Sequence, residues 1–132
     1  MITAVDTSAL IAIDQGEPNA EAWVDLLADC RNEGMLCICD VVAAEFFAVV
    51  LDEGEFTAIV AGLGIRMVPT SLAAACRAGK AFRAYRDEGG PREHLMPDCL
   101  IAAHALTDAN RLASADRGYF RRYFPDLVVV TP

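Results

Sequence analysis

Five short apolar runs, none with regular polar alternation, constrain the fold of this 132-residue chain more than any other feature. They predict strands at 2–5, 36–39, 65–68, 112–114 and 127–130. Strands that are apolar on both faces are typical of a parallel sheet covered on both sides. Longer helical patterns separate them, at about 8–13, 19–32, 41–62, 71–88 and 97–109. The sequence therefore predicts one three-layer α/β/α domain, residues 1–132, with a parallel sheet of about five strands.

Composition narrows the class of protein. No apolar run approaches the roughly 18 residues of a membrane-spanning helix, and Asp6 interrupts the first run before a signal peptide could form. The five cysteines are odd in number and contain no C-x-x-C pair, which favours a reducing compartment. His94 and His104 lack a second Cys or His at zinc-site spacing, so no structural zinc is expected. We expect a soluble, cytoplasmic protein without a membrane partner.

Charge is distributed unevenly along the chain. The formal net charge is −8, which by itself argues against a nucleic-acid partner. Residues 1–76 contain 2 basic and 12 acidic side chains, whereas residues 77–132 contain 9 basic and 7 acidic ones. Ten of the eleven cations are arginine, which suits bidentate contacts with phosphate. Four cations recur at every third position of the expected helix 71–88: Arg77, Lys80, Arg83 and Arg86. This pattern fits a solvated helix face as well as an RNA-binding one.

Four acidic residues occupy positions that a solvated surface does not explain. Asp6 follows the first apolar run, at a strand-to-helix junction where open α/β sheets place their ligand sites. Glu45 is the only polar residue in the run 41–51, and its helical neighbours are all Val or Ala. Asp98 begins an apolar helical pattern, and Asp116 follows the strand 112–114. We therefore treat these four acids as candidate functional residues.

Three of the four acids also have plain structural interpretations. Asp6 is a possible helix N-cap, Asp98 a first-turn acid favoured by the helix dipole, and Asp116 an ordinary turn residue. Glu45 has no such interpretation, because burying an unpaired carboxylate costs several kcal/mol. No Lys or Arg lies between Arg31 and Arg66 to pair with it in sequence.

A bound cation removes this difficulty. If the four acids converge at the carboxyl edge of the sheet, their mutual repulsion requires a divalent cation to hold them together. Ligation by oxygen alone, without Cys or His, selects a hard ion such as Mg²⁺ or Mn²⁺ rather than zinc.

The four motifs around these acids resemble those of PIN-domain ribonucleases of the VapC toxin type. The resemblance rests on Val5–Leu10, Ala44–Phe46, Pro97–Ala103 and Leu112–Phe120, and it covers essentially the whole chain. The acids follow one another at separations of 39, 53 and 18 residues, in the order and at the spacing of the family. Ser114 stands where that family often has threonine or asparagine, and it retains a hydroxyl.

The resemblance implies a PIN-like fold and a metal-dependent endoribonuclease that cleaves RNA phosphodiester bonds as the toxin of a toxin-antitoxin pair. Asp6 and Asp98 are then expected as direct ligands of Mg²⁺ or Mn²⁺, with Glu45 and Asp116 binding through water or at a second ion. Supporting roles fall to three hydroxyl residues and one candidate phosphate contact: Thr7, Ser8, Ser114 and Arg117.

The resemblance also implies protein partners, namely a cognate antitoxin and a second copy of the chain in a homodimer. A partner groove would require exposed apolar surface. A stripe of helix residues is the candidate, with core packing as the plainer interpretation: Trp23, Leu26, Leu27, Phe46 and Phe47.

Three other functions are open to the same residues. A haloacid-dehalogenase-type phosphatase needs a second Asp two residues after the first, where this chain has Ser8. A receiver domain needs a lysine at the end of its last strand, but the only lysine, Lys80, lies in a helical pattern. A catalytically silent PIN fold that only binds RNA or protein usually loses acids, whereas this chain keeps all four.

Overall fold

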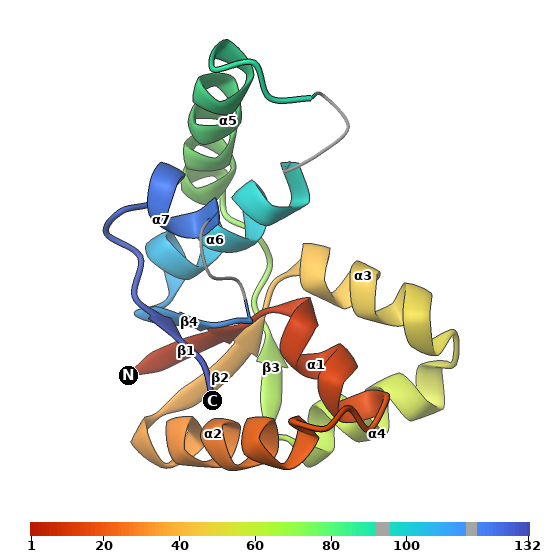
Figure 1. Ribbon diagram of the computed structural model, residues 1–132. Coiled ribbons are helices and arrows are strands. Elements are labelled where there is room, and N and C mark those ends of the chain that lie inside the picture. The colour runs from red at the N-terminus through yellow and green to blue at the C-terminus, as the bar shows by residue number, and fades with distance from the viewer. Residues whose placement is uncertain (92–95, 116–118) are drawn as a thin grey trace.

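A computed structural model describes residues 1–91, 96–115 and 119–132 (Figure 1). Its five strands form one parallel sheet in the order β3-β2-β1-β4-β5. Their bounds are β1 Ile2–Val5, β2 Met35–Ile38, β3 Ile65–Met67, β4 Arg111–Ala113 and β5 Val129–Val130. The helices are α1 Thr7–Asp14, α2 Ala20–Glu33, α3 Asp40–Val50, α4 Glu53–Gly62, α5 Leu72–Asp87, α6 Met96–Asp108 and α7 Tyr119–Tyr123. The five predicted strands and their parallel arrangement are confirmed.

The helices cover the sheet from both sides, as a three-layer α/β/α fold requires. Helices α5, α6 and α7 lie together on one side, and α1 to α4 lie on the other (Figure 1). From β1 the chain steps to β2 and β3 in one direction, and it then returns to β4 and β5 on the other side of β1. The direction of winding therefore reverses between β1 and β4. In open parallel sheets, ligands bind at the carboxyl ends of the two strands where this reversal occurs.

The central strands β1, β2 and β4 are apolar because both faces of the sheet are buried there, whereas two of the three residues of the edge strand β3 are exposed. Leu36 and Ile38 in β2 and Leu112 in β4 have at most 1% of their surface exposed. The one polar side chain inside β1, Thr3, is also fully buried, and its hydroxyl accepts a hydrogen bond from the Arg111 guanidinium at 2.8 Å. Burial on both faces thus explains the absence of alternation that predicted the parallel sheet.

One predicted helix is wrong in its extent. The pattern at 41–62 was expected to form a single helix, but the chain breaks into α3 and α4 at Leu51 and Asp52. Leu51 adopts a left-handed conformation with φ of 56°, which ends α3. The Asp52 carboxylate accepts the backbone N–H of Glu55 at 2.8 Å and so caps α4. The Asp-x-x-Glu sequence signalled this start. The short helix α7 was not predicted either.

All five cysteines are free, and four of them are buried. Burial raises the pKa of the Cys37 and Cys99 thiols to about 11. Thiols with such a raised pKa are protonated near neutral pH, which is typical of inert buried cysteines. Within the described ranges, no helix combines the length and apolarity that crossing a membrane requires.

His104 is a buried histidine in α6, the helix that packs against β1 and β4. It lies on α6 with 1% of its surface exposed, and its Nε2 atom has no hydrogen-bond partner among the described residues. Burial lowers its pKa below the ordinary value of 6.5, although Asp108, the Val68 backbone and Asp40 oppose the shift. His104 is thus a core residue whose burial favours the neutral imidazole in the folded protein.

His104 predicts a dependence of stability on pH. Because its pKa is lower in the folded state, the unfolded chain binds the proton more strongly, and stability falls as the pH drops below about 6.5. We expect His104→Gln to flatten the change in unfolding free energy between pH 7.5 and 5.5, with His94→Gln as the control. Urea denaturation at several pH values measures this. An unchanged pH dependence in His104→Gln would contradict it.

Candidate functional site

Asp6 lies at the carboxyl end of β1, where the winding of the sheet reverses. Its backbone N–H donates to the Ala113 carbonyl of β4 at 2.9 Å, so the pairing of β1 with β4 fixes its position. Only 9% of its surface is exposed. The residue occupies the N-cap position of α1, but its side chain makes no capping hydrogen bond. Asp6 is therefore the N-cap residue by position, but its carboxylate does not cap the helix.

Two serine hydroxyls hold the Asp6 carboxylate instead. Ser8 Oγ and Ser114 Oγ donate to the same oxygen, Asp6 Oδ2, at 2.7 and 2.8 Å. Ser114 follows β4 and is fully buried, whereas Ser8 lies in the first turn of α1. Both hydroxyls bind Oδ2, so neither of these two hydrogen bonds uses Oδ1. The predicted supporting roles of Ser8 and Ser114 thus have a geometric basis.

Ser8 also joins the two strand ends. Its Oγ accepts the backbone N–H of Ala115 at 3.1 Å while its own proton goes to Asp6. Ser8 therefore links Ala115, in the segment after β4, to the Asp6 carboxylate after β1. The contribution of Ala115 was not predicted, because a backbone amide 107 residues away from Ser8 leaves no signal in the sequence.

The side chain of Glu45 is bound by Thr7, the residue that follows Asp6. Thr7 Oγ1 donates to Glu45 Oε1 at 2.7 Å, across 38 residues of sequence. Thr7 is 8% exposed and Glu45 is half-buried on α3, a helix that packs against α1. Among the described residues, neither Asp6 nor Glu45 forms an ion pair with Lys or Arg. The structure therefore joins Glu45 to Thr7, the residue after Asp6, and none of the three ion pairs between described residues involves Glu45 or Asp6.

Asp98 lies in the first turn of α6 and is half-buried. Helix α6 contacts both β1 and α3, the elements that lead to Asp6 and carry Glu45. The charge of Asp98 adds to the effect of burial in raising the pKa of the neighbouring Cys99 thiol. The position is compatible with a shared site, and its direct role as a ligand stays a prediction.

Asp116 and Arg117 lie outside the described residues. Within the described part of the chain, no group of three or more His, Cys, Asp or Glu residues is arranged to hold a metal ion. Asp6, Glu45 and Asp98 are all described and do not form such a group by themselves. The fourth acid falls in the gap at 116–118, so a site built from all four acids is not tested by this geometry.

The described residues nevertheless fit a hard divalent cation. The Asp6 and Glu45 carboxylates are shielded from solvent in part, and each accepts hydrogen bonds from hydroxyl groups at one of its two oxygens. Among the described residues, no Lys or Arg forms an ion pair with either carboxylate. Hydrogen bonds that fix one carboxylate oxygen orient the other, as partners of metal-ligating carboxylates do. Oxygen donors without a neighbouring thiolate or imidazole suit Mg²⁺ or Mn²⁺.

Comparisons with known proteins agree with this fold. The sequence profile described as PIN domain matches residues 3–124. Comparison with curated protein sequences finds no match to this chain.

Several solved structures share the fold at low sequence identity. The VapBC2 complex of Rickettsia felis, bound to a DNA fragment from its promoter, matches with a TM-score of 0.74 and 19% identity over 99% of this chain and 98% of that chain. VapBC-1 of nontypeable Haemophilus influenzae matches with a TM-score of 0.72 and 18% identity over the same shares. Mycobacterium tuberculosis VapC20, described as a sarcin-ricin loop cleaving toxin, matches with a TM-score of 0.63 and 15% identity over 96% and 98%.

The site predicts that metal ions stabilise the fold. A ligand that binds only the folded state at 100 times its Kd adds about 2.7 kcal/mol of stability. Millimolar Mn²⁺ or Mg²⁺ is therefore expected to raise the melting temperature by several degrees, and Asp98→Asn to reduce that gain. Asp29→Asn, which removes an exposed carboxylate on α2, is the matched control. A melting temperature that ignores the ions in the unmodified protein would argue against a shared metal site.

Proposed function

This chain belongs to the PIN domain family, and we propose that it is a metal-dependent endoribonuclease that cleaves RNA phosphodiester bonds as the toxin of a toxin-antitoxin pair. Residues 1–132 would act as one nuclease domain. The observation that carries the proposal is the braced pair Asp6 and Glu45 at the point where the sheet reverses its winding. The family match over 122 residues and the shared fold of the VapC structures support it.

The four acids would hold Mg²⁺ or Mn²⁺, with Asp6 and Asp98 as direct ligands and Glu45 and Asp116 binding through water or at a second ion. A metal bound there lowers the pKa of a coordinated water and offsets negative charge on the phosphate. Asp6 would present Oδ1 to the ion, because both serine hydroxyls occupy Oδ2. Thr7 would keep Glu45 from rotating away, since its hydroxyl fixes Oε1. Arg117 is the proposed contact for the phosphate.

Protein partners form a second part of the proposal. The solved structures with this fold include complexes described as VapBC and a toxin-antitoxin complex from Klebsiella pneumoniae. By analogy we propose a cognate antitoxin, and also a homodimer, in a cytoplasm where the five free cysteines stay reduced. Co-purification of this chain with the product of an adjacent short reading frame tests for the antitoxin. Sedimentation of the isolated chain tests for the dimer.

The predicted partner stripe requires a correction. Trp23, Leu27 and Phe46 are at most 1% exposed and belong to the core, so they do not form a groove on the surface of this chain. Leu26 and Phe47 are half-buried. Exposed large apolar side chains lie elsewhere, among them Val49, Leu51 and Leu72.

Replacement of Glu45 gives the sharpest test of catalysis. Glu45→Gln preserves the volume and an amide oxygen that accepts from Thr7, but it removes the charge that would hold a metal or its water. We expect a metal-free protein at least as stable as the parent, because a neutral amide costs less to bury than a carboxylate. Cleavage of a mixed RNA pool with Mn²⁺ should fall about 100-fold or more.

Glu21→Gln is the matched control, since it makes the same change at an exposed helical position on α2. It should cleave at the parental rate. If Glu45→Gln folds, binds metal normally and cleaves like the parent, the catalytic proposal is wrong. If the parent itself binds RNA without cleaving it, the alternative of a silent RNA-binding PIN fold is supported.

Thr7 should matter through its hydroxyl alone. Thr7→Val preserves the shape of this buried side chain but removes the donor to Glu45 Oε1, whereas Thr7→Ser retains a donor. Loss of a group that orients a metal ligand typically lowers metal affinity or activity 10- to 100-fold. We expect a loss of about this size for Thr7→Val in both cleavage and the Mn²⁺-induced melting shift, with substantial recovery in Thr7→Ser. Equal losses in both variants would indicate a packing effect instead.

A further inference from the structure

The four cations of α5 face in different directions. A helix turns by about 100° per residue, so side chains spaced by three residues drift by roughly 60° at each step. Arg77 and Arg86 therefore point to opposite sides of the helix. Between them, the buried face of α5 packs against α6 through Ala74, Ala78, Ala81 and Tyr85. The regular spacing in the sequence thus does not form one continuous basic stripe.

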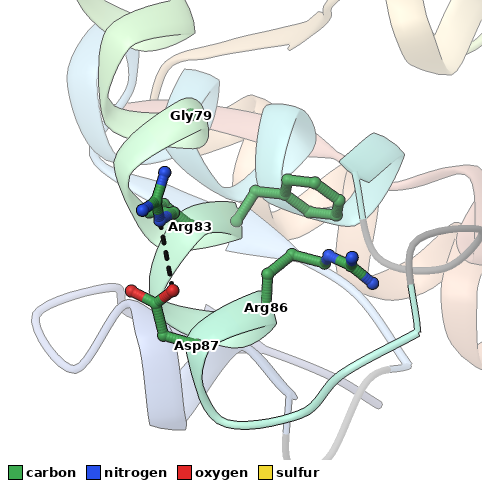
Figure 2. A pocket seen from close by; sticks show the side chains of 5 residues that line it. Gly79, Arg83, Arg86 and Asp87 are labelled. Atoms are coloured by element: carbon green, nitrogen blue, oxygen red, sulfur yellow. Dashed lines mark hydrogen bonds and ion pairs between the residues drawn. The ribbon is translucent and has the colours of Figure 1, made fainter.

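Arg83 and Arg86 are engaged at the end of their own helix. Figure 2 shows the ion pair between Arg83 Nε and Asp87 Oδ1, which are 3.1 Å apart. Arg86 Nη1 donates to the Gly90 carbonyl at 3.0 Å. These two residues border a shallow pocket of about 450 Å³ together with Gly79 and Phe82. Their charges are already directed at groups of the same segment, so they are the poorer candidates for an external anion.

Arg77 and Lys80 line a different hollow, between α5 and α7. This hollow has a volume of about 460 Å³ and receives Arg122 from the α7 side. Arg77 and Lys80 are exposed, and neither forms an ion pair with any described residue. Like charges three residues apart on a helix repel each other by a few tenths of a kcal/mol. An anion in the hollow would relieve this repulsion.

The acidic side chains of the hollow do not cancel these charges. Glu88 accepts hydrogen bonds from Tyr123 and Arg122, and these bonds lower the pKa of its carboxyl. Glu88 is therefore matched by Arg122. Asp126 is the one other acid that lines the described hollow. Two cations, Arg77 and Lys80, thus stand against one carboxylate, in a protein whose formal net charge is −8.

We propose that the hollow between α5 and α7 binds a backbone phosphate of the RNA strand that the site cleaves, through Arg77 and Lys80. The identity of the anion as RNA rests on the proposed function. Ser114, whose hydroxyl contacts Asp6, and Arg122, which lines the hollow, are eight positions apart in the sequence. Eight fully extended residues span at most about 29 Å, a distance that one RNA strand of several nucleotides can cover.

The contact should be electrostatic and independent of sequence. The Tyr85 and Tyr123 rings already pack against each other in a T-shaped arrangement, and Arg122 lies over the Tyr123 ring at 5.7 Å from its centre. Phe124, the other aromatic residue of the hollow, is only 5% exposed, so we expect charge rather than base stacking to carry the contact. Charged contacts with phosphate are revealed by the salt dependence of binding, since each one releases a counterion from the RNA.

The experiment measures the binding of a fluorescent single-stranded RNA of mixed sequence, roughly 20 nucleotides long, which exceeds what one groove covers. All proteins carry Asp98→Asn, so binding is read without cleavage. Arg77→Gln/Lys80→Gln is expected to weaken binding several-fold and to reduce the slope of log K against log salt by about 0.7, the value for one phosphate contact on a single strand. Asp126→Asn is expected to strengthen binding.

The matched control is Arg83→Gln/Arg86→Gln, which removes the same charge from another side of the same helix. It should leave the slope close to that of the parent. Equal slopes in both double variants would overturn the proposal, because only the net charge would then matter. An unchanged slope in Arg77→Gln/Lys80→Gln, with RNA still bound, would also overturn it while leaving the proposed function intact.

A cleavage assay with Asp98 restored separates the two proposals. Arg77→Gln/Lys80→Gln should raise KM with kcat unchanged, because the hollow binds RNA away from the reacting phosphate. If the parent binds RNA with the expected slope but cleaves none, the nuclease proposal fails and the hollow stands as an RNA-binding site. If the parent binds no RNA at low salt, both proposals fail.

Discussion

The hydrogen bonding of the Asp6 carboxylate is the interaction on which the candidate site depends. Ser8 and Ser114 donate to one oxygen of Asp6 from the two strand ends that flank the reversal of the sheet. Ser8 also accepts the Ala115 amide, so the carboxylate, the start of α1 and the exit from β4 form one hydrogen-bonded unit. A buried carboxylate without a cation is costly. The hydroxyls orient it, and the proposed metal would neutralise it.

This arrangement also explains why the fold places its polar residues as it does. The central strands β1, β2 and β4 are buried on both faces and supply rigidity, while the polar groups of the site begin at Asp6 and Ser114, the residues that follow β1 and β4. Glu45 reaches the same region from α3 because α1 and α3 pack together and Thr7 provides the donor between them. The site is therefore assembled from strand ends and first turns, positions whose backbone the sheet holds fixed.

The charges of the carboxyl-terminal half were the least informative part of the sequence. Arg77, Lys80, Arg83 and Arg86 form a regular series along the chain, but the structure separates them into two groups with different partners. The helix 41–62 was likewise misjudged, since the apolar composition near Leu51 concealed a left-handed residue followed by a capped start. In both cases, the local pattern indicated a helix correctly. It did not specify to which side the charged side chains of α5 point, or where the helix that begins near residue 41 ends.

By itself, the sequence determined the five strands, the parallel sheet and the candidate acids, because burial on both faces leaves a continuous apolar run and a strand end leaves a polar residue after it. The odd position of Glu45 was also visible, since a lone acid in an apolar helix requires a partner. Only the tertiary structure decided that this partner includes Thr7, and that Asp6 binds two serines rather than capping its helix. The contacts of Thr7 with Glu45 and of Ser114 with Asp6 join residues 38 and 108 positions apart, and such distances are set by strand order and helix packing rather than by local pattern.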